Sequence, residues 1–189
     1  MENTAIQNNI EEPEAYEIIN GREIMMAAAS MPHLDVQGNL YQVIKNYLEG
    51  KKCRVYSEAK VVFDEKNWLQ PDILVICDRD KIKKNHIEGA PDFVAEILSP
   101  ATQARDFNEK KSIYEKFGVP EYWIIDPTGK NVFIYLLKDD RYMNPVVHHL
   151  FNTDEWDALT RQERTMQTLT LKLSMYDDLE INLKKLFAR

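Results

Sequence analysis

The pattern of apolar positions divides this chain into segments of helical and of strand periodicity. Over residues 33–48, apolar side chains recur every three or four positions, which predicts a helix that starts near Pro32 and ends before Gly50. The same spacing returns over residues 105–117, where Gly118 follows as a stop signal. The sequence therefore predicts two helices with one apolar face each.

The strands are predicted by two other patterns, continuous apolar runs and alternation. Residues 72–77 and 93–98 are continuous apolar runs, typical of strands that are buried on both faces. Asn20-Gly21 separates two short alternating segments and predicts a β-hairpin over residues 16–26. Further strands are expected over residues 53–63 (with a bend near Glu58), 122–127, 132–138, 145–151 and 168–173, with a connector over 68–71 and a short C-terminal helix from Asp177-Asp178.

In chain order these elements give a hairpin, then the series α-β-β-β-α-β, and then further strands. Helices interspersed with strands in this way favour an α/β (mixed α+β) fold, in which helices flank a central mixed sheet. With 189 residues, the chain has the length of one domain, which we expect over residues 14–189 after a flexible tail over residues 1–13.

Composition and charge narrow the range of functions. A hydrophobic fraction of 44% is enough for a packed core, and the formal net charge of −7 argues against a protein that coats nucleic acid through its overall field. A local basic run at Lys81, Lys83 and Lys84 stands against this acidic background. It is either a weak contact for nucleic-acid phosphates or a solvated turn.

The sequence lacks the motifs of several common catalytic and binding sites. The glycines form neither a GxGxxG nor a GxxxxGK loop, no serine lies in a GxSxG elbow, and the four histidines form no HExxH. Nucleotide cradles, serine hydrolases and this zinc-protease motif are therefore not expected. The remaining chemistry must come from carboxylates, lysine and one histidine.

The two cysteines and the lengths of the apolar runs indicate the cellular compartment in which the protein is expected. Cys53 and Cys77 lie 24 positions apart in predicted strands, without a CxxC pair, and are expected to be separate buried side chains. The acidic N-terminus does not resemble a targeting peptide, and no apolar run is long enough to cross a membrane. We therefore expect a reduced, cytoplasmic location without membrane contact.

Glu96 is a charged residue inside an apolar strand. In the run 93–98 it shares one face with Val94 and Leu98, while the opposite face is also apolar. An unpaired carboxylate on such a surface costs several kcal/mol or stays protonated. Glu96 therefore requires a cation, a metal or hydrogen-bond donors, and the alternatives are a functional site and a structural salt bridge.

Asp72 gains significance from its position relative to Glu96. If the strands 72–77 and 93–98 pair antiparallel, the start of the first lies beside the end of the second. Asp72 and Glu96 are then neighbours at one rim of the sheet. Two converging carboxylates suit a hard divalent cation such as Mg²⁺ or Mn²⁺. Alone, Asp72 could equally be a turn or cap residue.

Lys110 lies where an apolar residue is expected. On a helical wheel it falls at the centre of the stripe formed by the apolar positions of residues 107–117. A lysine there is either paired with Asp106, four positions earlier, or directed towards Asp72 and Glu96. In the second case, the set of two carboxylates and one ammonium suits metal-assisted phosphodiester hydrolysis.

These residues resemble those of a known family. The order Pro71-Asp72, then Ala95-Glu96-Ile97-Leu98-Ser99-Pro100, then Asp106, Lys110 and Tyr114, then the run 118–127 (GVPEYWIIDP), is similar to the Uma-two family of the PD-(D/E)xK nuclease superfamily. The resemblance covers roughly residues 15–180 and is most specific between Pro91 and Pro127. It implies a restriction-endonuclease-like fold with an αβββαβ core.

The resemblance also implies roles for individual residues. Asp72 and Glu96 would be metal ligands, with the backbone carbonyl of Ile97 as a third. The position where the superfamily usually has its lysine is Leu98 here, and Lys110 on the following helix would replace it. Two accessory residues are His33, whose alternative is a capping or surface histidine, and Glu58, which lies in the strand before Asp72 and would be a further acid near the metal.

The implied activity is a Mg²⁺- or Mn²⁺-dependent endonuclease that acts on DNA, with a homodimer as the assembly. The strands after residue 130 or the hairpin at 16–26 would supply the dimer interface. Two alternatives stay open: a nuclease fold kept as a non-catalytic binding or assembly module, and a phosphoesterase acting on small nucleotides.

Overall fold

The computed structural model describes residues 16–189, so the tail expected over residues 1–13 lies outside the described residues. The strands are β1 (Tyr16–Ile19), β2 (Arg22–Met25), β3 (Arg54–Ser57), β4 (Val61–Asp64), β5 (Asn67–Leu69), β6 (Ile73–Ile76), β7 (Ile87–Glu88), β8 (Phe93–Ile97), β9 (Glu121–Asp126), β10 (Asn131–Lys138), β11 (Arg141–Tyr142), β12 (Val146–His149), β13 (Thr170–Lys172) and β14 (Glu180–Asn182). The helices are α1 (Met31–Tyr47), α2 (Gln103–Arg105), α3 (Lys111–Lys116), α4 (Thr153–Ala158), α5 (Arg161–Met166) and α6 (Leu183–Leu186), with a 3₁₀ turn at Arg79–Lys81 and a π-helical turn at Asp106–Lys110.

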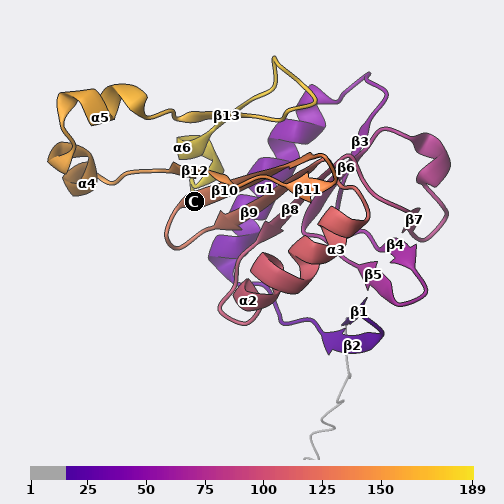
Figure 1. Ribbon diagram of the computed structural model, residues 1–189. Helices are drawn as coiled ribbons and strands as arrows, with labels where there is room; N and C mark the ends of the chain where they lie inside the picture. The colour runs from indigo at the N-terminus through magenta and orange to yellow at the C-terminus, as the bar shows by residue number, and fades with distance from the viewer. Residues whose placement is uncertain (1–15) are drawn as a thin grey trace, which may run out of the picture.

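A seven-stranded mixed sheet forms the centre of the fold, as expected (Figure 1). Its strand order is β11-β10-β9-β8-β6-β3, with β12 beside β10. The β8–β9 pair is parallel, whereas β3–β6, β6–β8 and β9–β10 are antiparallel. The α-β-β-β-α-β series and the α/β class are thus confirmed in the central part of the chain.

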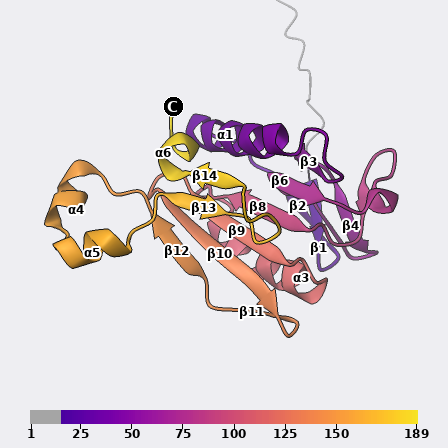
Figure 2. The same cartoon turned by 90° about the horizontal axis from the view of Figure 1, so that it is seen from above.

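Both faces of this sheet are covered, which explains why its strands read as continuous apolar runs. The helix α1 packs on one face through Val36, Leu40 and Ile44, together with the β13–β14 hairpin and α6. The helix α3 packs on the other face through Ile113 and Tyr114. Figure 2 shows α1 and α3 on opposite sides of the sheet.

The predicted start of the first helix, the hairpin turn and the bend near Glu58 are all present. Ser30 caps α1 by accepting a hydrogen bond from the His33 N–H, and Pro32 lies in the first turn. Asn20 and Gly21 both have positive φ angles in the β1–β2 hairpin. The bend expected near Glu58 separates β3 from β4, and Glu58 itself has φ 52°.

Two local predictions were wrong. The connector expected over residues 68–71 contains β5, which pairs with β4 and β1 in a second, five-stranded sheet. The helix expected from Asp177-Asp178 is instead a turn followed by β14 and the short α6. Both differences depend on tertiary pairing, which local periodicity does not record. The second helix is present as expected, and it contains a π-helical turn at Asp106–Lys110.

The helices α4 and α5 form an arm that projects from the β12 side of the molecule (Figures 1 and 2). Both carry complete capping boxes, yet neither has a buried residue. No helix in residues 16–189 is long and apolar enough to span a membrane.

The prediction of two separate cysteines was wrong, because Cys53 and Cys77 form a disulfide with Cα atoms 3.9 Å apart. They lie directly opposite each other, one position beyond the Arg54–Ile76 pair of the antiparallel β3–β6 ladder. Only the strand register brings them together. The reduced location inferred from unpaired cysteines therefore loses its basis.

Reduction of this disulfide is expected to lower the free energy of unfolding by about 3.5 kcal/mol, because the bond closes a loop of about 25 residues in the unfolded chain. Urea titration with and without dithiothreitol measures the difference. A Cys53→Ser, Cys77→Ser double variant is the control and should give the same midpoint in both conditions. Equal midpoints for the unmodified protein would show that the two sulfurs are not bonded in solution.

Candidate functional site

Asp72 and Glu96 lie side by side at one end of the central sheet. The antiparallel register pairs Ile73 with Ala95, so the next position brings Asp72 opposite Glu96. This confirms the strand pairing on which the prediction of a shared rim depended. Both residues line a pocket of about 420 Å³.

Two contacts fix the Asp72 carboxylate. The backbone N–H of Ile97 donates to Oδ2 over 2.6 Å, and His33 Nε2 lies 3.2 Å from Oδ1. Burial disfavours the charged imidazole, but the hydrogen bond and charge of Asp72, helped by Glu58, raise the pKa of His33 above its ordinary value. The backbone of His33 is bound to the N-cap residue Ser30, and its side chain faces the site. The raised pKa favours the protonated imidazole there.

The Glu96 carboxylate is almost completely buried. Its Oε1 accepts hydrogen bonds from Lys110 Nζ at 3.0 Å and from the Tyr114 hydroxyl at 2.5 Å. Burial raises the pKa of Glu96 well above the usual range, Lys110 opposes this shift, and the charge of Asp72 adds to it. The charged carboxylate is therefore costly, and a cation beside it relieves that cost.

Lys110 lies at the end of the π-helical turn, and its ammonium is surrounded by carboxylates. It is 2.9 Å from Glu17 Oε1, 3.0 Å from Glu96 Oε1 and 3.9 Å from Asp106 Oδ1. Burial acts to lower the pKa of Lys110, but these three acids raise it, so the side chain stays charged. Lys110 was expected either to pair with Asp106 or to point towards Asp72 and Glu96. Each interpretation is correct in part, because Asp106 is near but the shorter contacts are to Glu96 and Glu17.

Glu17 is a site residue that the sequence interpretation missed. It lies on β1 of the five-stranded sheet, is 1% exposed, and also accepts a hydrogen bond from the Gln70 N–H at 2.8 Å. A signal was present, because Glu17 shares a strand face with the buried Ile19. Nothing local indicates, however, that this face meets Lys110.

Glu58 lies on the rim of the same pocket. Its backbone N–H donates to the carbonyl of Pro71 at 3.1 Å, and its Oε1 accepts from Gln37 Nε2 at 3.1 Å. The same Gln37 nitrogen also reaches Ser57 Oγ and the Asp72 carbonyl. Gln37 on α1 therefore holds the end of β3 against the start of β6, and it was not recognised from the sequence.

The basic run is not brought to the pocket. Lys81 Nζ donates to the Ala90 carbonyl at 2.9 Å, and Lys83 Nζ donates to the Asp80 carbonyl at 2.8 Å. These residues and Lys84 lie in the β6–β8 connection, which starts from the end of β6 opposite Asp72. Two of the three ammonium groups thus bind the carbonyls of their own loop.

The pocket has two further walls that the sequence interpretation missed. The segment 26–29 forms one, and Ser99, Thr102 and Arg105 contribute to the other. Ser99 and Thr102 form a hydrogen bond with each other and begin the turn into α2, which positions the half-buried Arg105 at the pocket. Arg105 is the cation best placed to meet an incoming anion.

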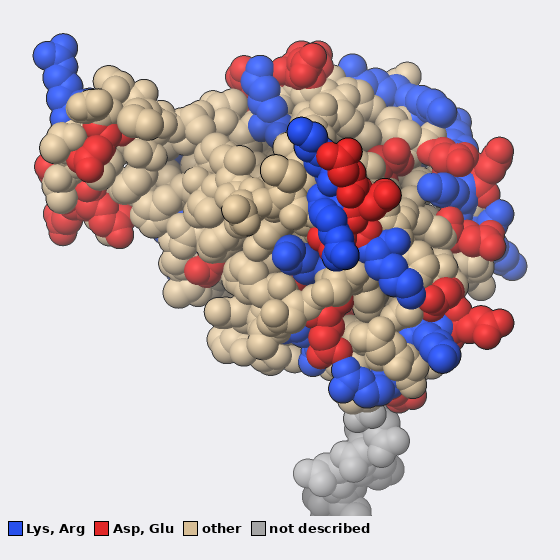
Figure 3. Space-filling view, in the orientation of Figure 1, with Lys and Arg blue, Asp and Glu red and all other residues tan. Residues whose placement is uncertain are grey.

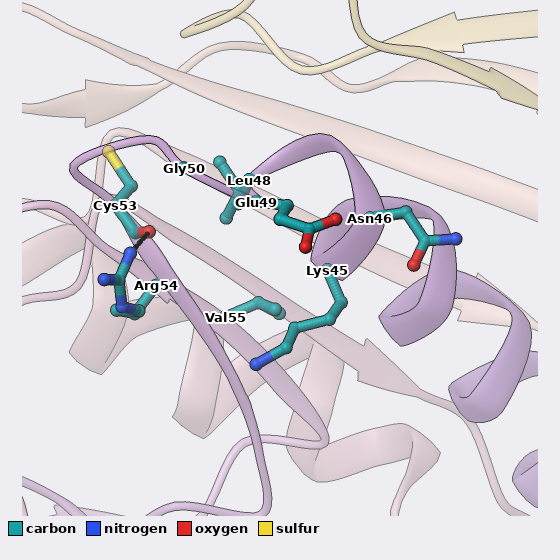
Figure 4. Close-up of a pocket in the computed structure, with 8 residues that line it drawn as sticks. All are labelled: Lys45, Asn46, Leu48, Glu49, Gly50, Cys53, Arg54 and Val55. Carbon is teal, nitrogen blue, oxygen red and sulfur yellow. Dashed lines mark hydrogen bonds between the residues drawn. The ribbon is translucent and has the colours of Figure 1, made fainter.

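A separate hollow of about 430 Å³ lies beside the end of α1 (Figure 4). It is lined by Lys45, Glu49, Cys53 and Arg54, among others. The Arg54 guanidinium donates to the carbonyls of Lys51 and Cys53, so it is occupied by its own chain. This hollow lies at the opposite end of β3 from Glu58 and shares no residue with the acidic pocket.

The donor set of the acidic pocket fits a hard divalent cation in part. In the described portion of the chain, no three His, Cys, Asp or Glu side chains are arranged so that they could hold a metal ion. A metal there would have two carboxylates, Asp72 and Glu96, and would need backbone and water oxygens for the rest. Mg²⁺ commonly binds through one or two carboxylates and keeps several waters, so this set is sufficient.

A mixed sheet with two acids at the rim of adjacent antiparallel strands, and a lysine supplied by the next helix, defines a protein of restriction-endonuclease-like fold. The comparison with known families agrees: the family model of Uma2 (Uma-two), described as "Putative restriction endonuclease", matches residues 3–172. The chain belongs to this family.

Two relatives show the extent of the similarity. The crystal structure of a protein from Anabaena variabilis, described as a "putative nuclease belonging to DUF820", superimposes with a TM-score of 0.69, has 26% sequence identity, and covers 93% of each chain. An uncharacterized protein of Synechocystis sp., slr1290, is 28% identical over 130 residues, which are 67% of this chain and 68% of that protein.

Proposed function

We propose that this protein is a divalent-metal-dependent endonuclease that hydrolyses phosphodiester bonds of DNA. The observation that carries the proposal is the arrangement of Asp72, Glu96 and Lys110 in one pocket, with Lys110 Nζ 3.0 Å from Glu96. Membership of a family described as restriction endonucleases supports the same reaction class. The negative charge of a phosphodiester requires cations, and the pocket supplies Lys110 and Arg105 itself.

Mg²⁺ or Mn²⁺ is the proposed cofactor, held by the carboxylates of Asp72 and Glu96 and by the backbone carbonyl of Ile97. When bound, such an ion supplies Lewis-acid polarisation of a phosphoryl oxygen. The hydrogen bond from Ile97 N–H to Asp72 holds this carboxylate against the backbone at Ile97. Three carboxylates surround the Lys110 ammonium, and Asp72 adds a further negative charge near Glu96, so an additional divalent cation would also offset their mutual repulsion.

The side chains of the protein have separate tasks in this proposal. Lys110 neutralises charge that develops on the phosphate, since it is fixed in position and stays protonated. Glu17 forms a second ion pair with the same ammonium and helps to fix its position. His33 orients Asp72, and Arg105 binds the entering phosphate at the pocket mouth.

The test is a cleavage assay with purified protein, using single-stranded, duplex and branched DNA in Mg²⁺, in Mn²⁺ and in excess EDTA. Cleavage is expected with at least one of the two ions and should be absent in EDTA. Cleavage in EDTA would contradict the metal requirement. If neither ion supports cleavage of any substrate, the nuclease proposal is wrong and the non-catalytic module is the better interpretation.

A further inference from the structure

The two oxygens of the Glu96 carboxylate have different environments. Oε1 accepts hydrogen bonds from Lys110 Nζ at 3.0 Å and from the Tyr114 hydroxyl at 2.5 Å. Within residues 16–189 no donor reaches Oε2, yet Oε2 is not enclosed by protein atoms, so it faces the open pocket that Glu96 lines. The carboxylate is therefore held by one oxygen and presents the other.

Both donors to Oε1 are fixed in position. Lys110 and Tyr114 are one helical turn apart, so their side chains lie on the same face and reach the same atom. Lys110 is also bound to Glu17 at 2.9 Å. The Tyr114 ring is 0% exposed and packs against Tyr122, with ring centroids 4.9 Å apart, and against Phe63 at 5.9 Å. Moving either donor away from Oε1 would disrupt these contacts.

The hydrogen bonds limit how each carboxylate can bind a metal ion. A carboxylate oxygen has two lone pairs, and the two donors to Oε1 use both of them. A metal ion can then bind Glu96 only through Oε2, unless it displaces one of the donors. Asp72 is restricted in a similar way, because Ile97 N–H donates to its Oδ2 and His33 Nε2 lies 3.2 Å from its Oδ1. Chelation of one ion by both oxygens of either carboxylate would compete with these contacts.

This restriction affects which divalent ion fits the pocket. Ca²⁺ takes roughly six to eight oxygen ligands and often binds a carboxylate through both oxygens. Mg²⁺ requires an octahedral set and keeps several waters, and Mn²⁺ accepts the same octahedral oxygen ligands. Two carboxylates that each offer one oxygen therefore favour Mg²⁺ and Mn²⁺ over Ca²⁺.

We infer that Tyr114 is a positioning residue: together with Lys110 it occupies Oε1 of Glu96, presents Oε2 alone to the metal, and so selects Mg²⁺ or Mn²⁺ over Ca²⁺. The inference rests on the proposed metal site at Asp72 and Glu96, and it adds the residue that sets the ion preference of that site. Tyr114 does not line the acidic pocket, so it acts through Glu96.

The first experiment replaces Tyr114 by phenylalanine, which removes the hydroxyl and keeps the ring. Calorimetric titrations with MnCl₂ and with CaCl₂ give the Kd of each ion for the metal-free protein. The unmodified protein should bind Mn²⁺ more tightly than Ca²⁺. In Tyr114→Phe the ratio of the Ca²⁺ Kd to the Mn²⁺ Kd should fall by about fivefold, less than the roughly tenfold value of one hydrogen bond to a charged group, because Lys110 still donates to Oε1.

Tyr122→Phe is the matched control for this substitution. Tyr122 is also 0% exposed, but its hydroxyl donates to the backbone carbonyl of Asp106 at 3.0 Å and not to Glu96. Its variant should lose stability, as Tyr114→Phe does, and keep the ion preference of the unmodified protein. A general effect of removing a buried hydroxyl would change the ion preference of both variants alike and would contradict the inference.

Acidic side chains on the surface are a second source of ion binding. On the face shown in Figure 3 they are intermixed with lysine and arginine side chains. Asp72→Asn, titrated in parallel with both ions, measures this background, which is subtracted from the other titrations.

A second measurement does not depend on a variant, and it decides the question even if Tyr114→Phe does not fold. A crystal of the unmodified protein soaked in MnCl₂ should show the ion on Oε2 of Glu96 while Tyr114 and Lys110 remain bound to Oε1. An ion bound by both oxygens of Glu96, or by Oε1 alone, would overturn the inference.

The outcomes separate the inference from the proposed function. If the ratio of the two Kd values is unchanged in Tyr114→Phe while Asp72→Asn abolishes specific binding, the metal site stands and the role assigned to Tyr114 is wrong. If neither ion binds the unmodified protein, or if Asp72→Asn binds both ions equally well, the metal site fails and the inference fails with it.

Discussion

Replacement of Lys110 by methionine is expected to reduce the rate of DNA cleavage by about 100- to 1000-fold, the typical effect of removing one fixed group that stabilises developing charge. Methionine fills a similar volume but carries no charge, so the loss measures the ammonium itself. Single-turnover kinetics on saturating DNA isolates this step from binding. A rate within a few-fold of the unmodified protein would show that Lys110 is not the catalytic cation.

The same substitution is expected to destabilise the fold by roughly 3–5 kcal/mol near neutral pH, since it leaves Glu17, Glu96 and Asp106 buried without their cation. Burial already raises the pKa of Glu96 and brings that of Asp106 to about 6, and loss of Lys110 raises both further. Groups with raised folded-state pKa values stabilise the fold below their unfolded pKa and lose that contribution as pH rises. The difference in the free energy of unfolding between the Lys110 variant and the unmodified protein should therefore become smaller at acidic pH. Urea titrations at several pH values measure this difference.

Glu17→Gln provides a graded comparison for Lys110. The variant removes one carboxylate partner of the Lys110 ammonium but leaves the ammonium itself in place. Cleavage should therefore fall by roughly tenfold, less than in the Lys110 variant. Glu121→Gln is the matched control, because Glu121 is also 1% exposed but is satisfied by Trp123 and Ser174, which are neutral donors. It should lower stability without changing the rate per folded molecule. Equal rate losses for both variants would indicate a general effect of disturbing buried acids.

Asp72→Asn is expected to abolish calorimetric Mn²⁺ binding and to lower cleavage by at least about a thousandfold, a loss in the range found when a fixed catalytic group is removed. Asparagine keeps the size of the side chain and can still accept the Ile97 hydrogen bond. It loses the charge that a hard cation requires. The change therefore separates metal binding from the structural contact.

Asp92→Asn is the control for this experiment. Asp92 accepts the backbone N–H of Cys77 over 2.7 Å at the opposite end of the same strand pair, so it has the structural contact of Asp72 without the pocket. Its variant should bind Mn²⁺ and cleave DNA like the unmodified protein. Unchanged Mn²⁺ binding in Asp72→Asn would show that the metal site is assigned to the wrong residues.

The core of the site was predictable because its signals are local. Glu96 interrupts a strand that is apolar on both faces, and Asp72 opens the preceding strand. Antiparallel pairing of two strands joined by one loop fixes which ends meet, and the β6–β8 register has that arrangement. Lys110 stood out for a similar reason, because helical geometry alone places it on the apolar stripe. In each case a polar residue conflicted with a pattern that its own segment defined.

The other components depend on contacts between distant segments. The connection of Glu17 to Lys110 requires the five-stranded sheet to pack against the second helix, and β5 within that sheet was taken for a connector. The Cys53–Cys77 bond depends on the register of β3 against β6. A one-residue shift in that register would separate the sulfurs without altering the sequence pattern.

The sequence by itself thus determined the central fold, the pairing of Asp72 with Glu96, and the unusual position of Lys110. These follow from periodicity and from the cost of placing charge on an apolar surface, and both are properties of short segments. Only the tertiary structure decided that Glu17 completes the charge cluster, that the cysteines are joined, and that the segment 26–29 borders the pocket. These depend on which surfaces pack together, and that choice is made by the total burial of the whole chain and by no single segment.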